Sequence, residues 1–254
     1  MGNVLFDERD MLQPDNHATR IPVVLCLDTS GSMKKNGGID ALNIGVQSFY
    51  RACQNDPINR YGFDVAIVTF GIQGVHREQD FRPIWNQEVV PSFSVKWVED
   101  NQLTPLGRGV DLAMQGLSHR KEEYKREAIS YKQPWLIVIS DGIPTDEGES
   151  AYDKTVDEVL RLQRERKLKV TMFGVGGQDF RKLSRFVIDK RVLETDDFSE
   201  FDLLFEFLSQ SISTHSGFSG DDSDELISPA AMLADEFADE GLSIRISDFS
   251  TDED

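Results

Sequence analysis

Apolar runs alternate along the chain with segments in which apolar residues recur every three or four positions. The runs cover residues 22–28, 64–70, 134–140, 168–175 and 191–194. The segments with helical spacing cover residues 39–53, 107–117 with a charged continuation to 129, 151–167 and 198–212. A run that is apolar throughout is typical of a strand buried on both faces of a parallel sheet, and the spaced segments predict amphipathic helices.

Strands that alternate with helices predict an α/β fold. Residues 74–84 add a meander or an edge hairpin, so we expect a central, mostly parallel six-stranded sheet with helices on both faces. Ligands of such sheets sit at the carboxyl ends of the strands. Two strands end in carboxylates, Asp28 and Asp141, which are therefore expected at the same edge.

The stretch LDTSGSM at residues 27–33 has three chemical interpretations. A phosphoryl-transferring aspartate needs a second carboxylate two residues later for acid-base work, and that position is Ser30. A phosphate-binding loop needs several glycines and a lysine, whereas Gly31 stands alone and Asp28 repels an anion. The third interpretation is a hard cation held by one carboxylate and by the hydroxyls of Ser30 and Ser32.

Two further oxygen donors follow in the sequence. Thr104 precedes Pro105 and a helix, where it can offer a third hydroxyl, and Asp141 ends the strand at residues 134–140. The candidate metal ligands are Asp28, Ser30, Ser32, Thr104 and Asp141.

DTSGS, the threonine of LTPLG and the aspartate of SDG together resemble the metal-ion-dependent adhesion site (MIDAS) of von Willebrand factor A (VWA) domains. The resemblance implies a Rossmann-like VWA fold over residues 18–216. It also implies direct binding of Mg²⁺ by the three hydroxyls, with Mn²⁺ and Ca²⁺ as alternatives, and binding partly through water by the two carboxylates. In this family a carboxylate from a partner protein typically completes the metal shell. We expect a binding protein, not an enzyme.

The segment RKEEYKREAISYKQPWLIVISDGIPTDE, residues 120–147, resembles the bacterial tellurium-resistance TerY-like VWA proteins. This resemblance implies a tellurite or stress-response setting, with a kinase-like protein and a PP2C-type phosphatase as partners. Two alternatives remain open: a VWA subunit of an ATPase-linked remodelling complex, and a Mg²⁺-dependent phosphohydrolase.

Charge separates the C-terminal tail from the rest of the chain. The net charge is −18, and residues 217–254 hold twelve acidic residues and one basic residue. A chain this acidic disfavours binding to nucleic acid and to anionic membrane surfaces. Two unpaired cysteines, Cys26 and Cys53, and an N-terminus with no long apolar stretch favour a cytoplasmic location. We expect residues 1–17 to be a flexible segment.

The tail itself carries local signals. Ser228, Pro229 and Gly241 frame a predicted helix, and Leu242, Ile244 and Ile246 alternate as in a strand. Three interpretations stay open: an element that docks on a partner or on its own domain, plain disorder, and an internal stopper that offers an acidic residue to the metal.

Several other polar residues are assigned structural roles. His76 and His119 are expected on the surface, away from any metal. Asp146 is expected to cap a helix that begins near Glu147, and Trp135 to lie in the core.

Overall fold

The computed structural model describes residues 18–85, 87–94, 103–176, 179–215, 230 and 244–251, so the N-terminal segment 1–17 lies outside the described residues. The strands are β1 (Ile21–Thr29), β2 (Phe63–Gly71), β3 (Gly74–Pro83), β4 (Trp135–Ser140), β5 (Lys169–Val175), β6 (Arg191–Thr195) and β7 (Arg245–Asp248). The helices are α1 (Gly31–Lys35), α2 (Gly38–Asn55), α3 (Leu106–Arg126), α4 (Ser150–Arg164), α5 (Arg181–Ser184), the 3-10 turn η1 (Phe198–Glu200) and α6 (Phe201–His215).

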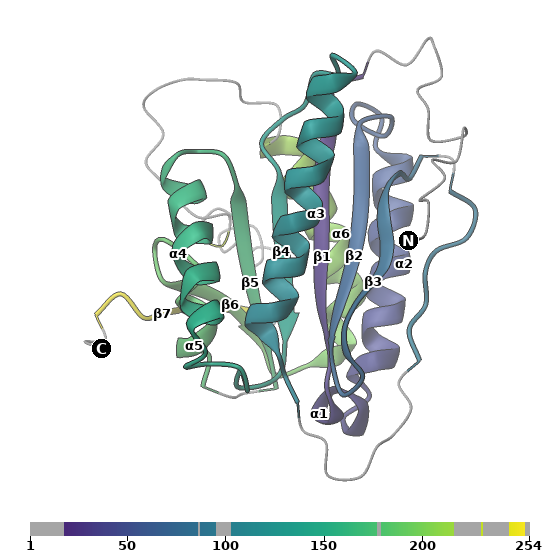
Figure 1. The fold of residues 1–254 in the computed structure, drawn as a ribbon. Coiled ribbons are helices and arrows are strands. Elements are labelled where there is room, and N and C mark those ends of the chain that lie inside the picture. Colours follow the sequence, from purple (N-terminus) through teal and green to yellow (C-terminus); the bar gives the residue numbers. More distant parts are fainter. Residues whose placement is uncertain are drawn as a thin grey trace.

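One sheet joins these strands in the order β3-β2-β1-β4-β5-β6-β7 (Figure 1). The five inner strands run parallel, and the two edge strands β3 and β7 run antiparallel to their neighbours. The α/β prediction and the mostly parallel sheet are confirmed, and the hairpin expected at residues 74–84 is β3. The predicted count of six strands is wrong, because β7 adds a seventh.

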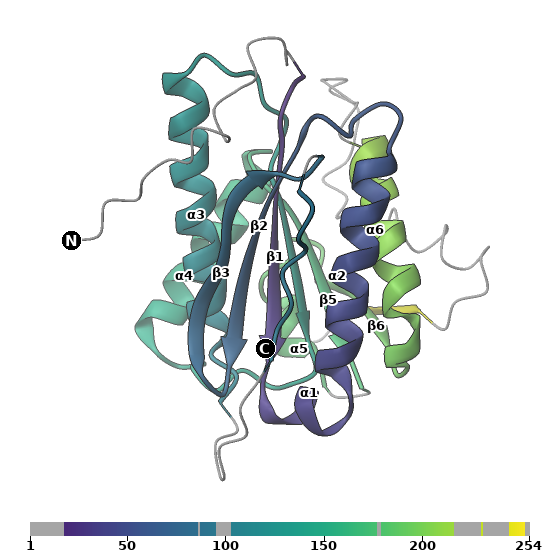
Figure 2. The same ribbon diagram turned by 90° about the vertical axis from the view of Figure 1, so that its right-hand side faces the viewer.

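Two helical layers cover the sheet (Figures 1 and 2). α2 and α6 lie on one face, and α3, α4 and α5 lie on the other. Along β1, Val23 and Leu25 belong to the core under α2 and α6, whereas Val24 and Cys26 belong to the core under α3 and α4. Because both faces are buried, β1 reads as a continuous apolar run. Trp135 is fully buried at the start of β4, as predicted.

The parallel register places the carboxyl ends of β1 and β4 side by side. Leu27 of β1 pairs with Ile139 of β4. Asp28 follows Leu27 directly and Asp141 follows Ile139 by two residues, so the two aspartates lie at the same edge of the sheet. The resulting edge lies at the bottom of Figure 1, where α1 follows β1. Among the described residues no helix has the length and apolarity that a membrane span requires.

The end of the acidic tail belongs to the sheet. The Arg245 guanidinium donates to Glu194 at 2.7 Å and to Asp196 at 3.0 Å, and Arg191 donates to Asp248 at 3.1 Å. Ile246 packs against the core under α2 and α6. Over residues 244–251 the tail therefore orders on its own domain, one of the outcomes expected for it. The predicted helix at residues 228–241 lies outside the described residues, apart from the buried Ala230.

We predict that Arg245→Ala lowers the free energy of unfolding by about 1 kcal/mol, because it leaves the nearly buried Glu194 carboxylate without its cation. Urea unfolding measures the change, and hydrogen exchange of β6 localises it. Arg191→Ala is the control, since its partner Asp248 is itself exposed. An equal loss of unfolding free energy in both variants would show that the Arg245 contacts stabilise the protein no more than the exposed Arg191–Asp248 pair.

Candidate metal centre

Asp28 lies near the end of β1 with its side chain fully buried. One oxygen, Oδ1, accepts the backbone N–H of Ser30 at 2.7 Å, and Oδ2 accepts the Ser140 hydroxyl at 2.5 Å. Both oxygens thus have neutral donors that fix the carboxyl group in place. Ser140 ends β4 and was missed by the sequence analysis, although its position immediately before Asp141 was a usable signal.

The two serines of the turn meet the second carboxylate. Ser30 Oγ and Ser32 Oγ lie 3.0 Å apart. Both hydroxyls donate to Asp141 Oδ1, from 3.3 Å for Ser30 and 2.8 Å for Ser32. Ser30 and Asp141 are buried, whereas Ser32 is exposed, so the oxygen cluster opens to solvent on the side of Ser32.

Thr104 reaches the same place from the segment before α3. Its N–H donates to Thr145 Oγ1 at 3.0 Å, and its carbonyl accepts the Thr145 N–H at 3.0 Å. A methyl group placed on Gly142 would lie 3.3 Å from Thr104 Oγ1 and 3.9 Å from Asp28 Oδ2. The Thr104 hydroxyl therefore borders the space that Asp28 borders. The structure brings all five predicted residues together, and their role as metal ligands stays a prediction.

The turn that carries the serines rests directly on β2. A side chain on Gly71 would meet backbone atoms of Thr29 and Ser30 at 2.3–2.6 Å. The Thr29 hydroxyl also donates to the Phe70 carbonyl at 3.2 Å. Only glycine at position 71 permits this approach, which sequence patterns alone do not reveal.

Burial dominates the electrostatics of the centre. Burial first and the nearby Asp141 carboxylate second raise the pKa of Asp28 to about 7, against the lowering effect of the hydrogen bonds from Ser140 and Ser30. Burial also raises the pKa of Asp141. Both carboxyl groups are short of positive charge, which a divalent cation supplies.

The donor set fits a hard cation. Two carboxylates and three hydroxyls provide only oxygen, the ligand that Mg²⁺ and Ca²⁺ prefer. In the part of the chain that the structure describes, no group of three or more His, Cys, Asp and Glu side chains is arranged to hold a metal. The candidate centre is therefore rich in hydroxyl ligands, and the described residues offer no alternative metal site built from histidine, cysteine and carboxylate clusters.

The model of the von Willebrand factor type A domain family matches residues 23–207. The chain belongs to the VWA family. This confirms the VWA resemblance, whereas the narrower resemblance to TerY-like proteins stays a prediction. No curated protein matches the sequence.

Solved structures share the fold of this VWA domain at low sequence identity. The pilus adhesin SpaC from Lactobacillus rhamnosus GG aligns with a TM-score of 0.57 and 15% identity, over 78% of this chain and 31% of SpaC. The vWF domain of the type V pili tip protein Mfa5 from Porphyromonas gingivalis aligns with a TM-score of 0.53 and 10% identity, over 82% of this chain and 99% of that domain. Proximal thread matrix protein 1 from the mussel byssus aligns with a TM-score of 0.50 and 19% identity, over 77% of this chain and 48% of the mussel protein. The chain thus spans less than half of SpaC and of the mussel protein.

Asp146 caps a different helix from the one predicted. Its Oδ1 accepts the N–H of Gly107 at 3.2 Å, and its Oδ2 accepts the N–H of Arg108 at 2.9 Å. These groups open α3, whereas α4 begins at Ser150 without a side-chain cap. The prediction of a cap is correct in kind and wrong in its target, because the loop after β4 folds back onto the start of α3.

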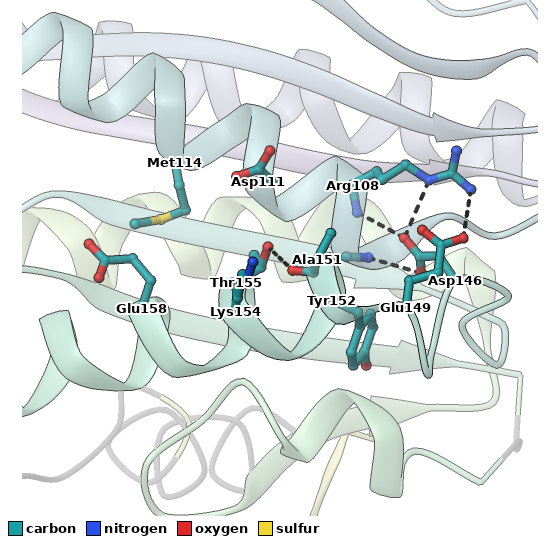
Figure 3. Close-up of a pocket in the computed structure, with 11 residues that line it drawn as sticks. Arg108, Asp111, Met114, Asp146, Glu149, Ala151, Tyr152, Lys154, Thr155 and Glu158 are labelled. Atoms are coloured by element: carbon teal, nitrogen blue, oxygen red, sulfur yellow. Dashed lines mark hydrogen bonds and ion pairs between the residues drawn. The ribbon is translucent and has the colours of Figure 1, made fainter.

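A cavity of about 220 Å³ lies between α3 and α4, next to this cap (Figure 3). In it the Arg108 guanidinium approaches Asp146 at 3.8 Å and Glu149 at 3.5 Å. None of the five candidate ligands lines the cavity. His76 and His119 are exposed, as predicted, and line neither the cavity nor the oxygen cluster.

The raised pKa of Asp28 predicts how the metal-free protein responds to pH. Between the unfolded pKa near ~4 and the folded value of about 7, the folded state holds more protons, so its stability falls as pH rises. From pH 5 to pH 8 we expect a loss of about 2–3 kcal/mol, measured by urea unfolding in EDTA. Asp28→Asn removes this titrating group and should reduce the slope to the part that Asp141 contributes. A slope unchanged in that variant would contradict the assignment.

The cap on α3 predicts a second effect. Asp146→Ala leaves two N–H groups of the first turn, one of them buried, without their acceptor and should cost about 1–2 kcal/mol of unfolding free energy. Asp146→Asn keeps an acceptor oxygen and should cost less. The ranking is read from thermal and urea unfolding, and an alanine variant as stable as the wild type would exclude the capping role.

Proposed function

We propose that this VWA domain is a Mg²⁺-dependent protein interaction module, in which a carboxylate of a partner protein completes the coordination of the ion. One observation carries the proposal: two carboxylates and three hydroxyls from three separate segments converge at the carboxyl edge of the sheet. Mn²⁺ and Ca²⁺ are the alternative ions, since they accept the same oxygen donors.

The residues divide the work of holding the ion. Ser30, Ser32 and Thr104 would hold the ion through their hydroxyls, and Asp28 and Asp141 would hold it partly through water. When bound, the ion supplies a positive centre that attracts a further anionic oxygen. Neutral hydroxyls next to the ion leave much of its charge unquenched, so the centre favours a carboxylate as its last ligand.

The surrounding hydrogen bonds keep the site prepared for binding. The Ser140 hydroxyl and the Ser30 N–H hold the Asp28 carboxyl group, so its oxygens cannot swing away. The two bonds between Thr104 and Thr145 hold the backbone of Thr104, from which the third hydroxyl projects. A preorganised site loses little conformational entropy when the ion and the partner bind.

Binding is favoured over catalysis by the residues of the turn. Phosphoryl transfer from an aspartate needs an acid-base carboxylate two residues along, and Ser30 stands there. Among the described residues the hydrogen-bond partners of the two carboxyl groups are hydroxyls and backbone N–H groups, which are not general bases at neutral pH. A Mg²⁺-dependent phosphohydrolase is therefore the weaker alternative.

The setting of the module is also a proposal. The resemblance over residues 120–147 supports a bacterial tellurite or stress-response system in the cytoplasm, with a kinase-like protein and a PP2C-type phosphatase as partners. A VWA subunit that acts beside an ATPase in a remodelling complex is the alternative for the same metal site. Co-purification with an ATPase, and not with a kinase or phosphatase, would favour that alternative.

Thr104→Ala tests the proposal because it removes one hydroxyl from a site that otherwise stays intact. We expect Mg²⁺ affinity, measured by isothermal titration calorimetry, to fall at least about tenfold, which equals about 1.4 kcal/mol. The tagged wild-type chain should retain its partner in Mg²⁺ and release it in EDTA, and the variant should retain little in either buffer.

Thr171→Ala is the matched control, since Thr171 is a buried threonine of β5 outside the oxygen cluster. It should bind Mg²⁺ and the partner like the wild type. Retention of the same partner in EDTA, or by Thr104→Ala, would contradict a metal-dependent interaction.

A further inference from the structure

Two exposed apolar side chains flank the candidate metal centre. The described part of the chain exposes seven large hydrophobic side chains, among them Leu103 and Ile143. Leu103 precedes Thr104 and is 45% exposed, and Ile143 follows Asp141 by two residues and is 54% exposed. A single exposed apolar residue needs no explanation, but two of them beside the same polar site mark an interaction surface.

The backbone joins the two segments that carry these residues. The segment after Leu103 and the segment after Ile143 are joined by the two hydrogen bonds between Thr104 and Thr145. Both segments also contain a buried proline, Pro105 and Pro144. Pro144 restricts the backbone of Ile143, and the paired threonines tie the two segments together. The backbone that carries the two apolar side chains is therefore rigid.

Several charged side chains on the Ile143 side of this edge are paired within the molecule. Arg108 approaches Asp146 and Glu149, and Glu147 accepts from Lys182 at 2.6 Å. These paired side chains contribute little net charge to the recognition of a partner. A bare cation, for its part, accepts any carboxylate that reaches it. Discrimination between carboxylates then has to come from what surrounds the ion.

We propose that Leu103 and Ile143 form an apolar lip that selects partner carboxylates with a large aliphatic or aromatic side chain within two residues of the acid. This inference rests on the proposed function, because the lip acts only when a carboxylate docks at the metal. The carboxylate binds at the ion, and the neighbouring apolar side chain covers Leu103 and Ile143. Burial of that area adds affinity only for partners with such a side chain.

The test uses the full chain and a displayed peptide library with a central aspartate between randomised positions. Selection in Mg²⁺ should enrich leucine, isoleucine, methionine or aromatic residues within two positions of the aspartate. Synthetic peptides from the selection should bind Leu103→Gln and Ile143→Gln about tenfold more weakly, measured by fluorescence polarisation. Ile58→Gln is the control, because Ile58 is also an exposed apolar side chain but lies in the loop before β2, at the amino edge of the sheet. Calorimetry should show wild-type Mg²⁺ affinity in all three variants.

The outcomes separate the lip from the proposed function. Peptides that need both Mg²⁺ and the aspartate but show no apolar preference, or bind both lip variants normally, would overturn the lip and leave the proposed function intact. If Mg²⁺ enriches no aspartate peptides over EDTA, the proposed function fails and the lip fails with it.

Discussion

Asp28 and Asp141 bring two carboxyl groups into one buried corner, and much of the surrounding structure holds them there against desolvation and mutual repulsion. Their hydrogen-bond donors are neutral: the hydroxyls of Ser30, Ser32 and Ser140 and the Ser30 N–H. Neutral donors fix the geometry of the two groups without cancelling their charge. A pair of carboxylates built in this way costs stability until a cation arrives, which is the property that a metal site needs.

A third buried carboxylate shows how the same protein treats an acid that has no ligand to bind. Asp64, at the start of β2, receives the Arg120 guanidinium at 2.7 Å and the Tyr124 hydroxyl at 2.5 Å. Its charge is therefore matched by a cation from α3. The contrast between the two ends of the sheet separates a structural ion pair from a site with unmatched charge, and it does so with side chains of one chemical type.

Much of the architecture was predictable from the sequence because the buried strands and amphipathic helices leave local, periodic signals. The motif residues were predictable for a related reason, since parallel strands place their carboxyl ends together. The misses have a common cause in contacts between distant segments. The alternation of residues 242–246 predicted a strand near β7, but its place in the sheet was missed because it depends on contacts with β6 such as that between Arg245 and Glu194. Asp146 caps α3 and not α4, which is nearer in the sequence. Position 71 requires glycine because the backbone of Thr29 lies too close for a side chain.

The attachment of the acidic tail to β6 through its one basic residue has a consequence for the kinetics of association. Arg245 is paired with Glu194 where it anchors β7, and all the other charged residues of the segment 217–254 are negative. This negative charge stays attached to a domain that is itself acidic. An acidic partner that approaches from solution meets repulsion at long range and attraction to the ion only at contact. Salt screens the long-range field over about 8 Å at physiological strength and leaves the contact largely unchanged. Encounter with such a partner is therefore faster at higher ionic strength, the reverse of the usual behaviour of charge-steered complexes.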